Sequence, residues 1–385
     1  MTLEIRGANI VSPDGILENG VLRIDGETIV GIGEAPMEAD AVIEAVGLYA
    51  MAGFVDIHCH GGGGFDFMDS DSDKMHRIAE YHLGYGTTSL FATTMTDTYE
   101  AIESVLLAYA SLDADERLTL EGVHLEGPWL APSMCGAQSN ERMCAPDPEK
   151  LKQLKEKYPF IKRVSAAPEL PGGMELGRIG RSLGINMSAG HTAADFSDIE
   201  EAIENGYDTM THFYSGMSGV YRKNAYRIAG AIEAGLALDG LTLEVIADGR
   251  HLPNELLRLI YKCRGADKIC LVTDAMRGAG FPDGEKTVLG KLDSGTPCII
   301  EDGVAKLYDR ESFAGSVATA DRLVRTMHSI GIPLTEVSKM ASKTPSELMG
   351  LFDRGELVIG KRADIVLLNK DLEIKKVIFK GEIVE

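Results

Sequence analysis

Two histidines early in the chain have a spacing that suits metal binding. His58 and His60 lie in the stretch Ala52–Gly64, which reads AGFVDIHCHGGGG. Alternate residues of a strand face the same side, so both imidazoles would project from one face at the end of an apolar strand. Imidazole nitrogen is a common ligand of divalent transition metals, and the glycines that follow let the backbone pass close to a bound group. The alternative is that both histidines only form hydrogen bonds in a loop.

The elements that must position these histidines are apolar stretches that alternate with helical patterns. Eight of them read as strands, at Val55–His60, Thr88–Thr94, Leu120–Glu126, Lys162–Ala167, Ile185–His191, Asp208–His212, Leu241–Asp248 and Ile269–Asp274. Eight βα units predict an α/β fold of the (β/α)8 barrel type, with its active site at the C-terminal ends of the strands. A doubly wound open sheet is the alternative, but GGGGF is a poor match to the dinucleotide-binding turn.

Five of the eight predicted strands end in a histidine or a carboxylate, which would gather these side chains at one mouth of the barrel. The residues are His58, His60, Glu126, His191, His212 and Asp274. This donor set suits one or two divalent ions such as zinc or ferrous iron. One ion could take the strand-one histidines and Asp274, and another could take His191 and His212, with Glu126 as the bridge. Any one residue alone could instead be a structural cap.

Such a centre predicts metal-assisted hydrolysis. A bound divalent ion lowers the pKa of water toward neutrality and polarises a carbonyl oxygen. Asp274 could accept the proton of the attacking water and pass it to the leaving group.

Composition limits the partners and the compartment. A net charge of −21 argues against nucleic acid or an anionic membrane as a partner. No apolar run approaches the roughly 20 residues of a spanning helix, and the N-terminus lacks the apolar region of a signal peptide. Six scattered cysteines without a CxxC pair indicate reduced thiols, and so we expect a cytoplasmic protein.

The two chain ends differ from the middle. Both read as short strands separated by polar turns, whereas strands and helices alternate between them. We therefore predict that residues 1–50 and 356–385 form a small β-sandwich domain and that residues 51–355 form the barrel.

Several motifs, in this order, resemble the N-acetylglucosamine-6-phosphate deacetylase branch of the amidohydrolase superfamily. They are HxH after strand one, GVHLEGP, AGHT, TH-F-x-x-M, ADGxH and LVTDAM, within a likeness that runs from about Gly53 to Arg362. The resemblance implies hydrolysis of the acetamide of an N-acetylated amino-sugar 6-phosphate by a metal-dependent homodimer. It makes Glu126, His191 and His212 the main metal ligands and Asp274 the catalytic acid and base. Some family members have other residues in place of the strand-one histidines and hold a single metal ion. Because this chain has both histidines, the resemblance permits two metal ions.

The resemblance also implies a set of substrate contacts. They are Ala137, Gln138, Ser215, Gly216, Lys223, His251, Phe313, Ala314 and Gly315. Two segments depart from the family. Ser215 and Gly216 replace Asn-Ala, and Lys223-Asn-Ala-Tyr226 replaces an Arg-Glu-Pro-Gly whose arginine contacts the 6-phosphate, often from the neighbouring subunit. Lysine binds phosphate without the bidentate fork of arginine, and Arg222 and Arg227 flank it.

These departures leave other readings open. The three cations could be a solvated loop on an acidic protein. The substrate could be N-acetylgalactosamine 6-phosphate or an unphosphorylated amino sugar. A non-catalytic scaffold is a third reading, which the complete set of six ligand residues disfavours.

Overall fold

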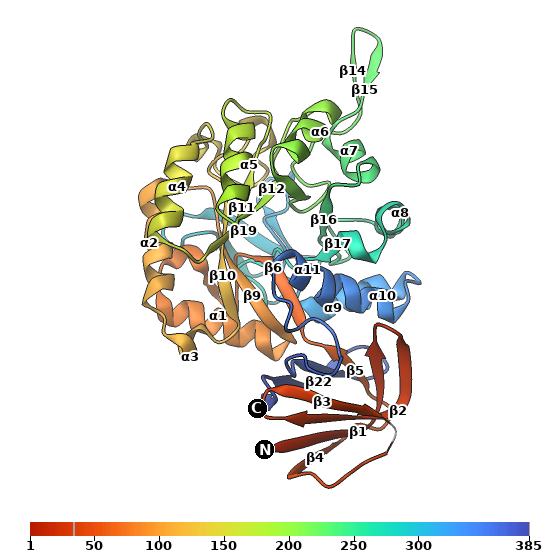
Figure 1. The fold of residues 1–385 in the computed structure, drawn as a ribbon. Helices are drawn as coiled ribbons and strands as arrows, with labels where there is room; N and C mark the ends of the chain where they lie inside the picture. The colour runs from red at the N-terminus through yellow and green to blue at the C-terminus, as the bar shows by residue number, and fades with distance from the viewer. Residues whose placement is uncertain (34, 385) are drawn as a thin grey trace.

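A computed structural model describes residues 1–33 and 35–384. Eight parallel strands surrounded by helices form a barrel, and a mixed sheet built from both chain ends lies at one side of it (Figure 1). The barrel strands are β6 (Phe54–Cys59), β9 (Thr87–Thr94), β10 (Leu120–Glu126), β11 (Ile161–Ala166), β12 (Asn186–Ala189), β13 (Tyr207–Met210), β16 (Thr242–Val245) and β17 (Ile269–Leu271). The predicted (β/α)8 fold class is thereby confirmed.

Four of these strands are shorter than the sequence pattern predicted. The predicted strands that ended at His191, His212, Asp248 and Asp274 stop two or three residues earlier, at Ala189, Met210, Val245 and Leu271. At three of those predicted ends the backbone has left β conformation, with φ of 45° at His191, 29° at His212 and 46° at Asp274. A non-glycine residue with a left-handed backbone conformation is strained, so contacts from the surrounding structure must hold it there.

The sheet follows the order β17-β16-β13-β12-β11-β10-β9-β6, and the gap between its two ends is closed by contacts beyond the regular ladder. Asp274 N donates to His58 O at 2.9 Å, and His60 N donates to Ala275 O at 2.8 Å. The buried Asp56 carboxylate accepts from Thr273 N at 3.3 Å and from Thr273 Oγ1 at 2.5 Å. The barrel therefore closes between β6, which carries His58, and the segment after β17, which carries Asp274.

Helices cover the barrel, and all of them except the short α3 bury apolar residues. They are α1 (Ser72–Gly84), α2 (Tyr99–Ser111), α3 (Ala114–Arg117), α4 (Pro148–Lys157), α5 (Gly173–Ser182), α6 (Phe196–Glu204), α7 (Ala231–Ala237), α8 (Asn254–Arg264), α9 (Ala320–Ser329), α10 (Leu334–Ser338) and α11 (Thr344–Leu348). In α1, Met75, Ile78, Ala79 and Leu83 are buried at the three- and four-residue spacing of one helix face. No helix in the described part of the chain is long and apolar enough to span a membrane.

The chain ends form a second sheet with its own apolar core. Its strands are β1 (Thr2–Ser12), β2 (Gly15–Asp25), β3 (Thr28–Gly33), β4 (Ala41–Glu44), β5 (Tyr49–Ala52), β21 (Ile365–Leu368), β22 (Ile374–Phe379) and β23 (Glu382–Val384). β1 pairs with β2 on one side and with β4 and then β5 on the other. β5 also pairs with β21, which joins the two ends of the chain.

Two further features were not predicted from the sequence. The hairpin of β14 (Tyr221–Lys223) and β15 (Tyr226–Ile228) projects away from the barrel (Figure 1). A three-stranded antiparallel sheet, β18 (Lys286–Leu289), β19 (Thr296–Glu301) and β20 (Val304–Leu307), follows the last barrel strand. Both lack the long apolar alternation that identifies a buried strand.

Gly53 provides a test of packing where the barrel meets the terminal sheet. Its N–H donates to Asp364 O at 2.9 Å, and a Cβ at this position would lie 2.3 Å from Oγ1 of the buried Thr88. We expect Gly53→Ala to lower the free energy of unfolding by about 1–3 kcal/mol, measured by urea denaturation, because the added methyl overpacks the junction.

Gly84→Ala is the matched control. Gly84 ends α1, and a Cβ at this position would have no neighbouring atom within 4 Å. Alanine there should leave stability unchanged or raise it by up to about 1 kcal/mol. Adding Thr88→Ala to Gly53→Ala should recover part of the loss, and equal losses in the single and double variants would contradict the proposed clash.

Candidate metal centre and active site

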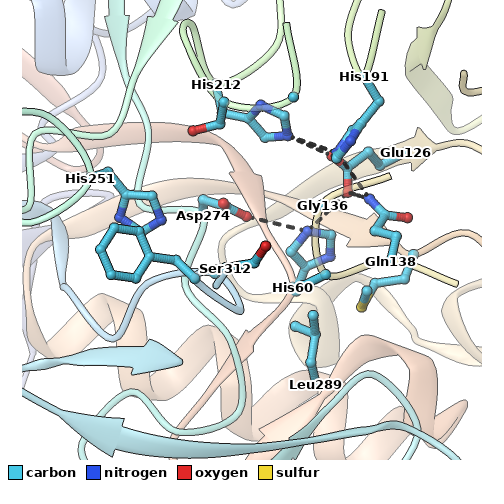
Figure 2. A pocket seen from close by; sticks show the side chains of 16 residues that line it. His60, Glu126, Gly136, Gln138, His191, His212, His251, Asp274, Leu289 and Ser312 are labelled. Carbon is cyan, nitrogen blue, oxygen red and sulfur yellow. Dashed lines mark hydrogen bonds and ion pairs between the residues drawn. The ribbon is translucent and has the colours of Figure 1, made fainter. Parts of the chain in front are cut away.

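The structure brings the six predicted ligand residues to one place at the C-terminal mouth of the barrel. Figure 2 shows His60, Glu126, His191 and His212 pointing toward one another, with Asp274 directed at His60. Two groups of potential ligands share Glu126: His58 and His60 on one side, and His191 and His212 on the other. Every member of both groups is buried.

The distances suit metal coordination. The Nε2 atoms of His191 and His212 lie 3.1 Å apart, and those of His58 and His60 lie 3.3 Å apart. Two nitrogens on a tetrahedral zinc, each about 2.0–2.1 Å from the ion, would lie roughly 3.3 Å apart. Glu126 Oε1 is 3.2 Å from His191 Nε2 and 2.9 Å from His212 Nε2, while its Oε2 is 3.2 Å from His60 Nε2.

The outer ring nitrogens support the same interpretation. Nδ1 of His191 lies 2.6 Å from Met134 O, and Nδ1 of His60 lies 3.3 Å from Thr93 O. Because a carbonyl oxygen only accepts, each Nδ1 carries a proton and a neutral ring keeps its Nε2 lone pair free. An acceptor behind the imidazole and a free nitrogen toward the centre is the usual arrangement around a metal, and His58, His60 and His191 have it. The donors therefore fit a divalent ion.

Glu244 on β16 supports two of the histidines at once. Its Oε2 lies 3.0 Å from His58 Nδ1 and accepts from the backbone N–H of His212 at 2.9 Å. Its Oε1 forms an ion pair at 2.7 Å with Nη2 of Arg163, a fully buried residue on β11. Burial disfavours ionisation of Glu244, but Arg163 and His58 outweigh it and hold the pKa of the carboxyl below its ordinary value.

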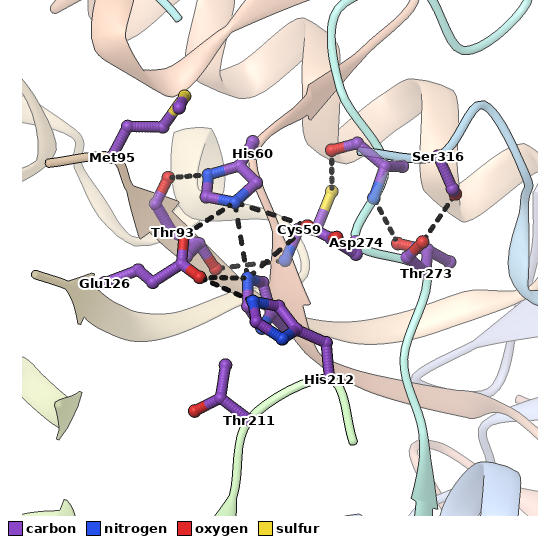
Figure 3. A network of polar contacts seen from close by, with 12 residues as sticks. Cys59, His60, Thr93, Met95, Glu126, Thr211, His212, Thr273, Asp274 and Ser316 are labelled. Carbon is purple, nitrogen blue, oxygen red and sulfur yellow. Dashed lines mark hydrogen bonds and ion pairs between the residues drawn. The ribbon is translucent and has the colours of Figure 1, made fainter. Parts of the chain in front are cut away.

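Asp274 is held by the seam of the barrel. Its carbonyl accepts from Ser316 N at 2.8 Å, and Ser316 Oγ donates to Thr273 O at 2.5 Å, as Figure 3 shows in part. The Asp274 Oδ1 atom lies 3.3 Å from His60 Nε2 and 3.5 Å from His58 Nε2. This network fixes a strained backbone so that the carboxylate faces the histidines.

The gathered charges shift the pKa values in opposite directions. Burial raises the pKa of Asp274, but His58 and His60 more than offset it and bring it to about 2. Glu126 is likewise held well below its ordinary pKa, because hydrogen bonds from His191, His212 and His60 outweigh burial. Burial lowers the pKa of His60 and His191, yet the carboxylates raise both above the ordinary value. Protons and a metal ion therefore compete for the same nitrogens.

A cavity of about 180 Å³ opens onto this centre. Its lining includes seven of the predicted substrate contacts, Ala137, Gln138, Ser215, Gly216, His251, Phe313 and Gly315. Ala314 is buried and lies outside the lining, and Lys223 lies exposed on the projecting β14. No lysine or arginine of the described residues lines this cavity.

Gln138 and His251 are both fixed by hydrogen bonds. Gln138 Oε1 accepts from Thr96 N at 2.9 Å, which directs its Nε2 to Glu126 Oε2 at 2.6 Å. His251 Nδ1 lies 2.8 Å from Asp248 Oδ2, and the His251 ring packs against Phe313 with centroids 4.8 Å apart. His251 Nε2 is thus left to contact a ligand.

Sequence reasoning missed several residues of the site. Met95, Leu289 and Ser312 line the cavity, and Glu244 and Asp248 hold its histidines. Glu244 could have been found, because an acidic residue inside an apolar strand signals a buried charge that needs a partner. Leu289 and Ser312 carry no local signal, since only the packing of the β18–β20 sheet and the loop after it brings them to the cavity.

Known proteins resemble this chain along its whole length. It is 32% identical to the N-acetylglucosamine-6-phosphate deacetylase of Lysinibacillus sphaericus, over 100% of this chain and 98% of that protein. It is 30% identical to the N-acetylgalactosamine-6-phosphate deacetylase of Escherichia coli O157:H7, over 100% of this chain and 99% of that protein. The crystal structure of N-acetyl-D-glucosamine-6-phosphate deacetylase from Mycobacterium smegmatis is 29% identical, with a TM-score of 0.90 and 100% coverage of both chains.

The family match covers the elements that build the site. The amidohydrolase family matches residues 49–384, which run from β5 of the terminal sheet through the barrel to β23 of the same terminal sheet. That range contains both histidine pairs, Glu126 and Asp274. The fold, the convergent donors and this match together show that the chain belongs to the amidohydrolase family, whose members are hydrolases.

Proposed function

We propose that this amidohydrolase removes the acetyl group of an N-acetylated amino-sugar 6-phosphate. N-Acetylglucosamine 6-phosphate is the first candidate, and the products are acetate and glucosamine 6-phosphate. The observation that carries the proposal is the buried Glu126 shared by two histidine pairs, with Asp274 beside them at the floor of a small cavity. Relatives of known name over the full length support the substrate class.

The metal is proposed to be zinc or ferrous iron, with one or two ions per chain. His58, His60 and Asp274 would hold one ion and His191 with His212 the other, with Glu126 between them. When bound, a divalent ion supplies a Lewis acid that acidifies water and polarises the acetamide carbonyl.

Side chains of this protein then provide proton transfer and contacts to the substrate. Asp274, held ionised by its histidine neighbours, accepts the proton of the attacking water and delivers it to the departing amine. Gln138 presents an oriented amide N–H to substrate oxygen at the same floor. His251 and Phe313 contact the sugar farther from the centre, where Asp248 keeps the His251 ring in place.

We further propose a cytoplasmic homodimer in which the β14–β15 hairpin reaches the partner subunit. An isolated two-stranded hairpin is marginally stable in water, and this one exposes Tyr226 by 77% and Tyr221 by 39%. It also carries Arg222, Lys223 and Arg227, whereas the described lining of the cavity offers no such cation. A 6-phosphate would therefore take its positive partners from the other subunit. All six cysteines are free, in keeping with a reducing compartment.

The function is tested by acetate release from four sugars: the N-acetylated glucosamine and galactosamine, each with and without the 6-phosphate. We expect kcat/KM to be highest for N-acetylglucosamine 6-phosphate. Removing the phosphate from the substrate should lower kcat/KM by roughly 10–100-fold, because about 1.5–3 kcal/mol of charge-assisted hydrogen bonding is lost. Preference for the galactosamine epimer would favour the second candidate, which the Escherichia coli relative supports.

Lys223→Ala separates phosphate recognition from chemistry. It should lower kcat/KM for the phosphorylated sugars and leave that for the unphosphorylated sugars unchanged. Equal activity of the variant and the parent on all four sugars would remove Lys223 from the site. No acetate from any of the four would refute the proposed function.

Asp274→Asn tests the proton-transfer role. We expect kcat to fall by roughly 10²–10⁴, the usual contribution of a general base, while the ion at His191 and His212 is retained. Acetate release and metal analysis by mass spectrometry measure the two effects. Asp293→Asn, an exposed residue on the loop between β18 and β19, is the control and should behave as wild type. Activity within tenfold of wild type in Asp274→Asn would contradict the assigned role.

Metal affinity should rise with pH. His60 and His191 have pKa values above the ordinary value, so each must release a proton when a metal binds below that pKa. Each displaced proton adds a slope of about one log unit of affinity per pH unit. Zinc competition against a chromophoric chelator at pH 6, 7 and 8 measures this slope, and a pH-independent affinity would argue against these two ligands.

A further inference from the structure

Glu244 is a buried carboxylate that the proposed reaction does not use. It lies on β16, is 1% exposed and contributes no atom to the lining of the cavity. Replacing a buried ion pair by apolar residues of similar volume is often neutral or stabilising, so stability alone gives no reason for this carboxylate inside a barrel. Its contacts give a different reason.

One oxygen of Glu244 touches a member of each histidine pair. Oε2 faces the ring nitrogen Nδ1 of His58 at 3.0 Å and accepts from the backbone N–H of His212 at 2.9 Å. The two histidines come from β6 and from the turn after β13, and across the seam of the barrel β17 and β16 lie between these two strands. Glu244 therefore contacts one histidine of each pair with the same oxygen atom.

Arg163 fixes the other oxygen. Its Nη2 lies 2.7 Å from Glu244 Oε1, and its Nη1 donates to Asn186 on β12. The ion pair between Oε1 and the guanidinium from β11 opposes rotation of the carboxylate away from His58 and His212. The backbone contact matters most for His212, whose Nδ1 is buried without a hydrogen-bond partner among the described residues.

We propose that Glu244, held by Arg163, is a positioning residue that sets the separation of the two histidine pairs. At that separation a single Glu126 carboxylate reaches both pairs, so Glu244 decides whether the chain holds two ions or one. This inference rests on the metal centre of the proposed function.

Glu244→Gln tests it with little change of shape. An amide has one oxygen, so its NH₂ must face either the Arg163 guanidinium or the two donors on His58 and His212, and one contact is lost. The inference requires two zinc ions per chain in the wild type, and we expect one in Glu244→Gln. A wild type that saturates at one ion would overturn the inference but not the proposed function. The affinity of the lost site, measured by calorimetric titration of the metal-free enzyme, should drop by roughly 10–100-fold.

Asp364→Asn is the matched control. Asp364 is 2% exposed and pairs with Arg362, but it contacts none of the clustered histidines. It should keep two zinc ions per chain. The unfolding temperature with and without zinc distinguishes a positioning role from a purely structural one. Loss of a positioning residue should reduce the zinc-induced rise in unfolding temperature more than it lowers the unfolding temperature of the metal-free protein.

Arg163→Lys provides a second variant if Glu244→Gln does not fold. Lysine keeps the charge but not the fork that reaches both Glu244 and Asn186, so it should weaken the second zinc site in the same direction. Two zinc ions of wild-type affinity in either variant, or simultaneous loss of both ions, would overturn the positioning role. A wild-type enzyme that binds no zinc or ferrous iron would overturn the proposed function together with this inference.

Discussion

The arrangement of the site depends on one buried carboxylate that faces two pairs of imidazoles. Glu126 is 1% exposed and lies within 3.2 Å of a nitrogen from His60, His191 and His212. A charged group taken out of water must be paired and hydrogen-bonded, and here its partners are the groups that a divalent ion would also use. Folding and metal binding therefore share the same contacts.

The barrel satisfies this constraint by placing strain where the ligands are needed. His191, His212 and Asp274 have left-handed backbone conformations immediately beyond their strands. Local sequence would not keep them there. Contacts from neighbouring elements do, such as Glu244 with His212 N and Ser316 N with the Asp274 carbonyl. Such strain persists only where the surrounding structure imposes it.

Charge is distributed unevenly between the centre and the cavity above it. The centre has two carboxylates among four histidines, with Arg163 and Glu244 as a further buried pair. The cavity lining of the described residues contributes no lysine or arginine. Chemistry at the amide is thus provided within one chain, whereas recognition of a phosphate is proposed to need the hairpin of a second chain.

The sequence by itself determined the barrel class, the eight strands and the six residues that meet at its mouth. Alternation of apolar residues is a local property that can be read from the sequence. Parallel strands in a barrel place all their C-terminal ends at the same mouth, so the proximity of His58 and Asp274 could be predicted from the sequence alone. Tertiary structure decided the rest. Leu289, Glu244 and the projecting Lys223 acquire their surroundings from contacts between segments far apart in sequence, and short strands such as β14 and β18 take their form from a neighbouring strand. Residue type and spacing do not encode those distances, because they arise only when the chain packs.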